Sequence, residues 1–507
     1  MIDGVQFIQT PPAKAPPAPS AECGVKTTAS PAIKNAPLPA DGPGARSFSN
    51  LAMAGFVVLI PYFVARKLGG GFKTWLFFTL LFALPIMMAY WTLLSSYSPR
   101  INQKVKLPNK PISHYLEFHT PELKAKYETS NNGKGTKIPM ETFQQLYFDG
   151  KVSFKGDCLD VMEYRHDWAS FRFTLGLFRF FLLGMIPEVI FHSQSQDEEQ
   201  VRDHYDRGDD FYTWFLGPRM IYTSGVIGDI TREETLEEMQ DNKLRIVADK
   251  IQLKEGEEVL DLGCGWGTWA TYASSQYGAG VTGVTLGKNQ TKWGTSLLEK
   301  YGITSKQSRI ACVDYRDSPK SQKPNGLYDK ITCLEMAEHV GIRRLTTFFE
   351  QVHDSLEDDG LFFLQYAGLR KSWQYEDLVW GLFMNKYIFP GADASTPLTF
   401  VVSCLESAGF EVVSVDNIGV HYSATLWRWY RNWMGNKDKV VNKYGIKWFR
   451  IWEYFLASAT QISRQGSATC YQFVLRKNLN SYHRINYVPA QKGLQAPIAE
   501  GTKWVKN

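Results

Sequence analysis

The chain has 507 residues, a formal net charge of +5 and a pI of about 8.6. This length predicts one large domain with appendages rather than a single core. The mild positive charge suits a protein near anionic lipid, and the lack of arginine-rich or zinc-knuckle patterns argues against a nucleic-acid partner. The seven cysteines are odd in number and widely spaced, which predicts free, reduced thiols. The 15 Trp, 25 Tyr and 31 Phe are typical of a membrane-interface protein or of one with an apolar substrate.

The N-terminal part of the chain predicts a tail and a transmembrane hairpin. Residues 1–47 are rich in Pro, Ala, Gly and Lys, which predicts disorder. Within residues 48–97, two apolar segments at about 51–67 and 74–94 predict a helical hairpin across a membrane. A buried pair of helices in a soluble protein is the alternative, but neither segment has a polar face. Charge counting leaves the orientation open. Because a hairpin returns the chain to the same side, a cytosolic cofactor would place the rest of the chain in the cytosol.

Two further segments precede the main domain. Residues 98–167 are mixed and polar, which predicts a linker with a little local structure. Residues 168–193 are strongly apolar, but Arg172 and Arg179 interrupt them on one helical face. This pattern predicts a helix lying in the membrane interface, with a third span or a core helix as the alternatives.

Residues 194–480 have the pattern of a globular α/β domain. Residues 235–251 alternate apolar and charged side chains at helical spacing. Apolar runs separated by helical segments predict a parallel, doubly wound sheet with a late antiparallel strand. These runs are residues 259–262, 280–286, 309–314, 328–334, 360–364, 410–415 and 468–475. The tail at 481–507 has no usable periodicity.

The first of these runs continues into a glycine-rich turn, Val-Leu-Asp-Leu-Gly-Cys-Gly-Trp-Gly-Thr, at residues 259–268. This is the pattern of a strand, a tight turn and a helix start. Gly263, Gly265 and Gly267 would leave bare backbone for a nucleotide-like ligand, and Asp261 would orient the turn or the polar end of the ligand. A glycine turn chosen only for packing is the alternative.

Polar residues also follow the next strands, at the edge where parallel sheets bind ligands. Thr285 and Gln290 come after the second strand, where a ribose is usually held by an acidic residue. Gln290 would take part of that role. Asp314 and Tyr315 follow the third strand and place a carboxylate and an aromatic face where an adenine would be held.

The fourth strand is followed by Glu335-Met336-Ala337-Glu338-His339. Two carboxylates three residues apart would share a helical face, and the imidazole of His339 adds proton-transfer capacity. The alternative for Glu338 is a structural carboxylate at a helix start.

With these motifs in order, residues 200–475 resemble the family of cyclopropane-fatty-acid synthases and mycolic acid methyltransferases. The matching stretches are 204–212, 220–224, 259–267, 281–290, 314–317, 335–341, 385–390 and 421–422. The resemblance implies a Rossmann-like class I methyltransferase sheet with S-adenosylmethionine as cofactor. Together with the N-terminal hairpin, the chain is similar to the fungal sphingolipid C9-methyltransferases.

The resemblance also implies roles for particular residues. Cofactor contacts would fall on Tyr222, Thr223, Gly263, Gly265 and Gln290.

In the cyclopropane enzymes a bound bicarbonate acts as base, held by a Cys, a Glu, a His and a Tyr. Glu338 and Tyr422 match two of these positions, whereas Ser224 stands at the Cys position and Gln365 at the His position. Bicarbonate binding is therefore left open.

These departures bear on the product. Methyl transfer to an alkene carbon leaves a cation on its neighbour. Loss of a proton from the new methyl closes a cyclopropane, whereas loss of the neighbouring vinylic proton restores the alkene with a methyl branch. The non-basic Gln365 leaves Glu338 as the expected proton acceptor or base organiser. Aromatic faces available to the cation, or only to packing, are Tyr422, Trp266 and Tyr366.

The resemblance therefore implies an S-adenosylmethionine-dependent C-methyltransferase that acts on C9 of the sphingoid base of ceramide, in glucosylceramide biosynthesis. The expected catalytic residues are Glu338, Tyr422 and His339. The expected partners are ceramide or a related sphingolipid and a membrane, with no metal and no nucleic acid. The resemblance implies a multi-pass protein of the endoplasmic reticulum membrane with a cytosolic catalytic domain. Cyclopropanation of unsaturated phospholipid acyl chains and a catalytically silent lipid-binding scaffold are the alternatives.

Overall fold

The computed structural model describes residues 30–34, 48–97, 108–130, 135–185, 208–390 and 395–485. The predicted tails, 1–47 and 481–507, lie mostly outside these residues. Of the first tail, the short segment 30–34 is described, and it packs on the main domain through Ala32, which is 1% exposed. The six cysteines in the described part of the chain are all free thiols, as expected.

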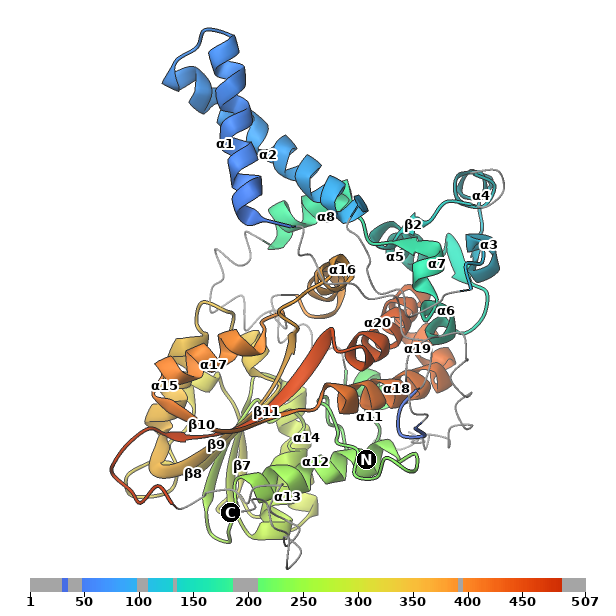
Figure 1. The fold of residues 1–507 in the computed structure, drawn as a ribbon. Helices are drawn as coiled ribbons and strands as arrows, with labels where there is room; N and C mark the ends of the chain where they lie inside the picture. The colour runs from blue at the N-terminus through green and yellow to red at the C-terminus, as the bar shows by residue number, and fades with distance from the viewer. Residues whose placement is uncertain are drawn as a thin grey trace, which may run out of the picture.

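The described residues of the main domain form a seven-stranded sheet in the order β10-β11-β9-β8-β5-β6-β7 (Figure 1). All neighbouring strands are parallel except β11, which runs antiparallel to β9 and β10. The strands are β5 (Glu258–Leu262), β6 (Gly280–Thr285), β7 (Arg309–Cys312), β8 (Tyr328–Leu334), β9 (Leu356–Leu369), β10 (Phe410–Asn417) and β11 (Ala468–Lys477). The predicted doubly wound sheet with a late antiparallel strand is confirmed.

Helices cover both faces of the sheet because its strands are apolar on both sides. Along β9, Phe362 and Leu364 pack in the core formed with α15 and α17, whereas Leu361 and Phe363 pack in the core formed with α12 and α13. These helices are α12 (Leu236–Lys250), α13 (Thr268–Tyr277), α14 (Lys288–Lys300), α15 (Leu345–Ser355) and α17 (Leu398–Ser407). Helix α12 lies within the predicted range, and a capping box between Thr235 and Glu238 fixes its start.

A third group of helices lies beside the sheet and carries most of the aromatic residues. It comprises α11 (Asp209–Leu216), α16 (Tyr375–Phe383), η5 (Met384–Ile388), α18 (Gly419–Gly435), α19 (Lys437–Tyr444) and α20 (Ile446–Arg464). Trp429, Trp433 and Trp452 are fully buried between α11, α18 and α20. This core continues to Trp266 of the glycine-rich turn.

The predicted linker at 98–167 is wrong, because its described residues, 108–130 and 135–167, continue with 168–170 into one folded subdomain. They fold into α3 (Ile112–Tyr115), β1 (Leu116–Phe118), α4 (Pro121–Tyr127), β2 (Ile138–Pro139), α5 (Met140–Phe148), β3 (Val152–Phe154), α6 (Cys158–Met162), α7 (Arg165–Trp168) and β4 (Ala169–Ser170). Phe118, Phe143 and Trp168 are fully buried here. The subdomain packs on α20, where the Tyr147 hydroxyl donates to Glu453 Oε2 at 2.6 Å. Its elements are too short to give a periodic signal in the sequence.

The apolar stretch 168–193 is not a single helix. Trp168 ends α7, and a new helix α8 (Leu175–Phe180) begins after Thr174, whose side chain accepts a hydrogen bond from the Leu177 backbone N–H. A π-helical turn, η2 (Phe181–Met185), follows α8, and residues 186–193 lie outside the described part. The backbone thus leaves the helix between 169 and 174, where the sequence suggested continuity.

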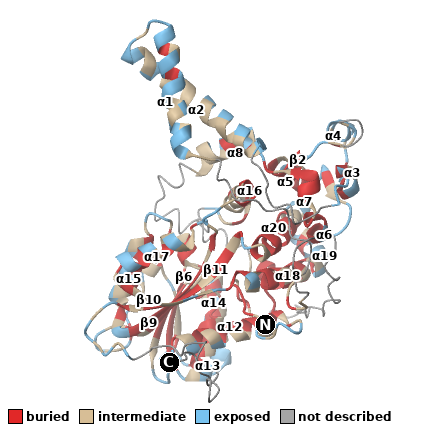
Figure 2. Ribbon diagram, viewed as in Figure 1, coloured by how far each residue is buried: buried red, intermediate tan, exposed pale blue. Residues whose placement is uncertain are grey.

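Helices α1 (Asn50–Lys67) and α2 (Phe72–Tyr97) form a hairpin that projects from the rest of the molecule (Figures 1 and 2). Both are long and apolar enough to cross a membrane. Their apolar side chains are largely exposed, with Leu80 at 74% and Phe63 at 65%. Among the described residues, the base of the hairpin contacts the rest of the molecule, for example through the rings of Trp91 and Phe173, whose centroids lie 5.1 Å apart.

Candidate active site

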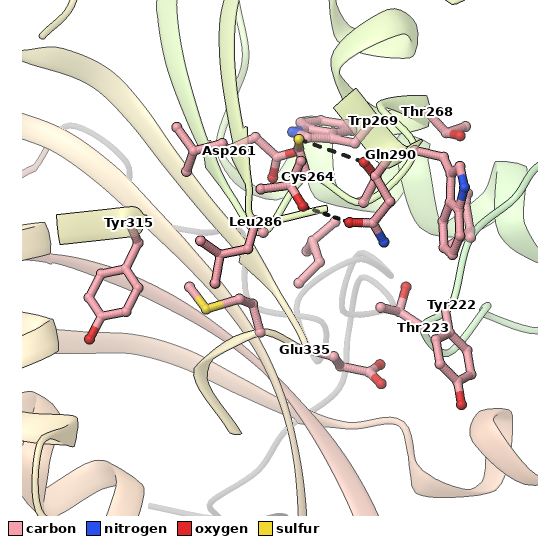
Figure 3. Close-up of a pocket in the computed structure, with 18 of the residues that line it drawn as sticks. Tyr222, Thr223, Asp261, Cys264, Thr268, Trp269, Leu286, Gln290, Tyr315 and Glu335 are labelled. Atoms are coloured by element: carbon pink, nitrogen blue, oxygen red, sulfur yellow. Dashed lines mark hydrogen bonds between the residues drawn. The ribbon is translucent and has the colours of Figure 1, made fainter. Parts of the chain in front are cut away.

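A pocket lies at the carboxyl ends of β5, β6, β7 and β8, and residues 220–223 and α12 also line it. Tyr222 and Thr223 lie across the pocket from Tyr315 (Figure 3). It encloses about 1150 Å³ of empty space, part of which is open to solvent. Among its lining residues are these members of the predicted site: Tyr222, Thr223, Asp261, Gly263, Gly265, Thr285, Gln290, Asp314, Tyr315 and His339. The sheet topology therefore brings together side chains from five separate segments.

The three glycines of the turn have different tasks. All three have positive φ angles, 76° at Gly263, 53° at Gly265 and 77° at Gly267. A Cβ built on Gly265 would meet no described atom within 4 Å, so the bare backbone there faces open pocket. A Cβ on Gly267 would instead meet the Cα of Gly294 in α14 at 2.9 Å. Gly267 does not line the pocket, and its small size serves the close contact of α13 with α14.

Polar groups after β6 and β7 face the same pocket. The hydroxyl of Thr285 donates to Gln290 Oε1 at 2.6 Å, which turns the amide nitrogen of Gln290 toward the pocket (Figure 3). Asp314 is held by Arg316, whose Nε and Nη2 atoms each lie 2.6 Å from a carboxylate oxygen. Burial acts to raise the pKa of Asp314, but the bonds to Arg316 outweigh it and leave that pKa below its ordinary value. The guanidinium also lies 5.0 Å from the ring centre of Tyr315.

Buried charges lie deeper in the pocket. Burial raises the pKa of Asp261 to about 7, although a hydrogen bond from Thr332 at 2.8 Å and the charge of Lys243 act to lower it. Lys243 is fully buried and donates to Thr223 Oγ1. Burial lowers the pKa of Lys243 to about 8, although the charge of Glu335 acts to raise it. Sequence reasoning missed Lys243 because it belongs to the amphipathic pattern of α12 and to no recognised motif.

Glu335 also lines the pocket, and residues from several separate segments contact its carboxylate. Its Oε1 accepts from the backbone N–H of Ser224 at 2.9 Å and from Gln365 Nε2 at 2.6 Å. The thiol of Cys470 lies 3.6 Å from the same oxygen. Tyr422 interacts with this carboxylate too: burial, and then the charge of Glu335, raises the pKa of Tyr422 well above its ordinary value. Sequence reasoning noted Glu335 only as a neighbour of Glu338.

The predicted shared helical face of Glu335 and Glu338 is wrong. Glu335 has a φ angle of 56°, and the 3-10 helix η4 (Ala337–His339) begins only two residues later. The two carboxylates consequently take different directions. Glu338 does not line the pocket; its Oε1 accepts from the Ala367 backbone N–H at 2.6 Å. Burial, reinforced by the charge of Glu335, raises the pKa of Glu338 to about 8.

The remaining predicted residues lie around this centre. His339 lines the pocket, and its ring lies 6.1 Å from that of Phe389. Of the aromatic faces considered from the sequence, Trp266 lines the pocket and donates through Nε1 to Asp209 at 2.8 Å. Tyr422 and Tyr366 lie outside the lining, and the hydroxyl of Tyr366 pairs with that of Thr396 at 2.7 Å.

Comparison with known proteins adds the following. The family described as mycolic acid cyclopropane synthetase matches residues 192–473. The sphingolipid C9-methyltransferase of Candida albicans is 77% identical over 506 residues, covering 100% of this chain and 99% of the relative. That of Komagataella phaffii is 71% identical over 486 residues, covering 95% and 98%. The crystal structure of mycolic acid cyclopropane synthase CmaA1 complexed with SAH and CTAB matches with a TM-score of 0.52 at 26% identity, covering 55% of this chain and 98% of that one. The family match thus spans the sheet and pocket, whereas the two relatives match nearly the whole chain.

Proposed function

Since this chain belongs to the mycolic acid cyclopropane synthetase family and, within it, to the sphingolipid C9-methyltransferases, we propose that its acceptor is the sphingoid base of ceramide, methylated on the way to glucosylceramide. The chain is an S-adenosylmethionine-dependent methyltransferase acting on a sphingolipid, and this activity is favoured over cyclopropane synthesis. The observation that carries the proposal is the 77% identity to a sphingolipid C9-methyltransferase along the whole chain.

S-adenosylmethionine supplies an electrophilic methyl group when bound. The bare backbone at Gly265 and the inward-facing amide of Gln290 support a fit of the pocket to this nucleoside. We assign cofactor binding to Tyr222, Thr223, Asp261, Gly263, Gly265, Thr285, Gln290, Asp314 and Tyr315. Gly267 supports the turn by packing against Gly294, and we do not assign it a contact with the cofactor.

The proposed catalytic residues lie at the end of the pocket that follows β8. His339 lines the pocket there, and Tyr422 interacts with the carboxylate of Glu335, which also lines it. Glu338 acts as a positioning residue, because it accepts from the backbone of Ala367 and is raised in pKa to about 8. A carboxyl group with that pKa is mostly protonated at neutral pH and is a poor proton acceptor there.

We also propose that α1 and α2 cross the endoplasmic reticulum membrane as a hairpin and keep the catalytic domain on the cytosolic face. The exposed apolar surface of both helices supports this placement, because a helix in the core of a soluble protein would be buried. Exposed Leu175 and Leu183 beside the hairpin base, with exposed Arg179 between them, suit the interface. Delivery from the bilayer avoids exposing a hydrocarbon chain to water, which costs about 0.8 kcal/mol per CH₂.

The test is mass spectrometry of lipids after the full-length chain, embedded in vesicles, acts on an unsaturated ceramide with methyl-deuterated S-adenosylmethionine. We expect a product that retains all three deuteriums, because methyl branching removes a hydrogen from the acceptor. Retention of two deuteriums would favour ring closure, since that route removes a hydrogen from the new methyl group. Parallel incubations with glucosylceramide and with an unsaturated phospholipid test the acceptor. Faster methylation of either lipid would overturn the assignment to ceramide.

A further inference from the structure

The methyl-branching reaction needs a group that accepts a proton. Among the described residues, three carboxylates line the pocket. Asp314 is bound through both oxygens by Arg316. Asp261 lies within β5, just before the glycine turn, and accepts a hydrogen bond from Thr332 on the neighbouring strand β8. Glu335 is the third, and it stands at the end of the pocket where Tyr222 and Thr223 lie (Figure 3).

The position of Glu335 follows from the sheet. Leu334, the last residue of β8, pairs with Gln365 of β9, and the Glu335 backbone N–H donates to the Gln365 carbonyl at 2.8 Å. The next peptide then turns sharply, because Glu335 adopts a φ angle of 56° that side-chain-bearing residues rarely adopt. Such strain costs about 1 kcal/mol or more and is typical of functional positions. Here it directs the carboxylate into the pocket.

A chain of amides fixes the direction of one donor that meets this carboxylate. Lys250 Nζ donates to Gln472 Oε1 at 2.8 Å, and Gln472 Nε2 donates to Gln365 Oε1 at 2.9 Å. The Gln365 amide is thereby oriented with its nitrogen toward Glu335 Oε1, at 2.6 Å. The Gln365 nitrogen therefore donates, and the Glu335 oxygen accepts. The buried charge of Lys243 attracts it further.

We propose that Glu335 is the proton acceptor of this enzyme and a catalytic residue, and that its carboxylate takes the place of a bound base. The proposal rests on the function assigned above. The Ser224 backbone N–H, the Gln365 amide and the Cys470 thiol all meet Oε1, and the Tyr422 hydroxyl also hydrogen-bonds to this carboxylate. We assign the proton to Oε2, the oxygen that the first three donors leave open. As the methyl–sulfur bond breaks, a carbon–carbon bond forms at C9 and the adjacent carbon becomes cationic. The C9–H electron pair then restores the double bond, and the proton passes to Glu335.

The same geometry argues against bicarbonate in this chain. Ser224 and Gln365 occupy two of the positions where the resemblance would place bicarbonate contacts. Both already donate to Glu335, and the Ser224 hydroxyl is directed to the Gly225 carbonyl at 2.9 Å. A second anion at this place would meet a carboxylate instead of donors. The residues present therefore do not fit bicarbonate.

The experiment compares full-length wild type with Glu335→Gln, which keeps the shape and loses the basicity. We expect turnover to fall by about 100-fold or more, while the calorimetric affinity for S-adenosylmethionine stays within about threefold. Glu350→Gln, at an exposed position on α15, is the control and is expected to match wild type. A Glu335→Gln enzyme that turns over within threefold of wild type would overturn the proposal. Absence of methylated product from the wild type itself would instead overturn the proposed function.

A second variant separates chemistry from structure. Glu335→Gly suits the positive φ angle and frees the donors of Ser224 and Gln365 for an added anion. We expect it to be inactive alone and to regain at least tenfold in turnover with formate or bicarbonate at tens of millimolar. Glu335→Gln is expected to show no such rescue, because the amide fills the site. Equal anion response of both variants, or none in Glu335→Gly, would count against a proton-accepting role.

Discussion

At the scale of single residues, neighbouring carboxyl groups in this site have opposite surroundings. Glu335 receives hydrogen-bond donors and faces the buried cation of Lys243. Glu338, three residues later, has one backbone donor at Oε1 and no hydrogen-bond partner for Oε2 among the described residues. Environment therefore assigns one carboxyl to proton transfer and keeps the other neutral, as expected when burial and donors differ.

The neutral state of Glu338 predicts a pH dependence of stability. Burial raises its pKa from 4.5 to about 8, so between these values the unfolded chain is ionised while the folded chain holds a proton. Folding stability from this group therefore falls as pH rises from about 4.5 to 8. Glu338→Gln removes the titration, so its melting temperature relative to wild type should rise steadily between pH 5 and pH 8. Thermal unfolding in detergent measures this difference, and a constant offset across the range would contradict it.

Sequence reasoning found ten of the residues that line the pocket because strand ends are visible as apolar runs that stop at polar residues. Gln290, Asp314 and His339 were predicted in this way, and they line one pocket. Glu335 was not selected because its role depends on a φ angle of 56° and on Gln365, a residue from another strand. The sign of a φ angle and the register between two strands depend on the tertiary structure, and a local sequence pattern does not predict them.

At the scale of elements, buried ion pairs join the subdomain at 108–170 to the catalytic domain, and the one at Glu376 brings together three charged or titratable side chains. Arg165 and His166 of α7 both contact Glu376 of α16, and Arg165 and Glu376 are 2% and 8% exposed. Burial acts to raise the pKa of Glu376, but the charges of Arg165 and His166 outweigh it and lower that pKa far below its ordinary value. The partners are about 210 residues apart in sequence, so no local pattern predicts them.

Replacing Glu376 by Gln should destabilise the protein by about 3–5 kcal/mol at neutral pH, because it leaves the guanidinium of Arg165 buried without its counter-charge. A carboxylate with a depressed pKa stabilises the fold above its unfolded pKa of about 4.5, and this stabilisation is lost as pH falls toward the folded pKa. The difference in the free energy of unfolding between Glu376→Gln and wild type should therefore become smaller as the pH is lowered. Denaturant unfolding at pH 7 and pH 4 tests both statements.

The matched control for this change is Asp149→Asn, which breaks an exposed ion pair with Lys447 across the same junction. An exposed pair contributes little, so the control should lose less than about 1 kcal/mol. Equal losses in the two variants would show that the buried pair has no special part in holding the subdomain.

At the scale of the whole molecule, an apolar hairpin is attached to the catalytic domain through one aromatic core. Met87, Met88 and Trp91 at the hairpin base pack against the same core that Tyr222 and Tyr422 border beside the pocket. Length and apolar composition were enough to predict both helices from the sequence, since these properties are local. Their junction with the catalytic domain depends on contacts such as Trp91 with Trp373, whose ring centroids lie 6.2 Å apart, and was not predictable.

If the hairpin spans a bilayer, charged side chains introduced at the middle of α2 should weaken membrane binding and leave cofactor binding in the pocket intact. Leu80 and Leu84 lie one turn apart near the centre of α2 and are 74% and 40% exposed. A lysine at the centre of a transmembrane helix costs about 3 kcal/mol, so the double change Leu80→Lys with Leu84→Lys should lower recovery with vesicles in a flotation assay. Binding of S-adenosylmethionine should persist, while methylation of membrane-embedded ceramide falls.

Ile230→Lys, at a 69% exposed position of the catalytic domain, is the control and should leave flotation unchanged. Normal flotation of the double variant would mean that the hairpin packs on protein rather than on lipid.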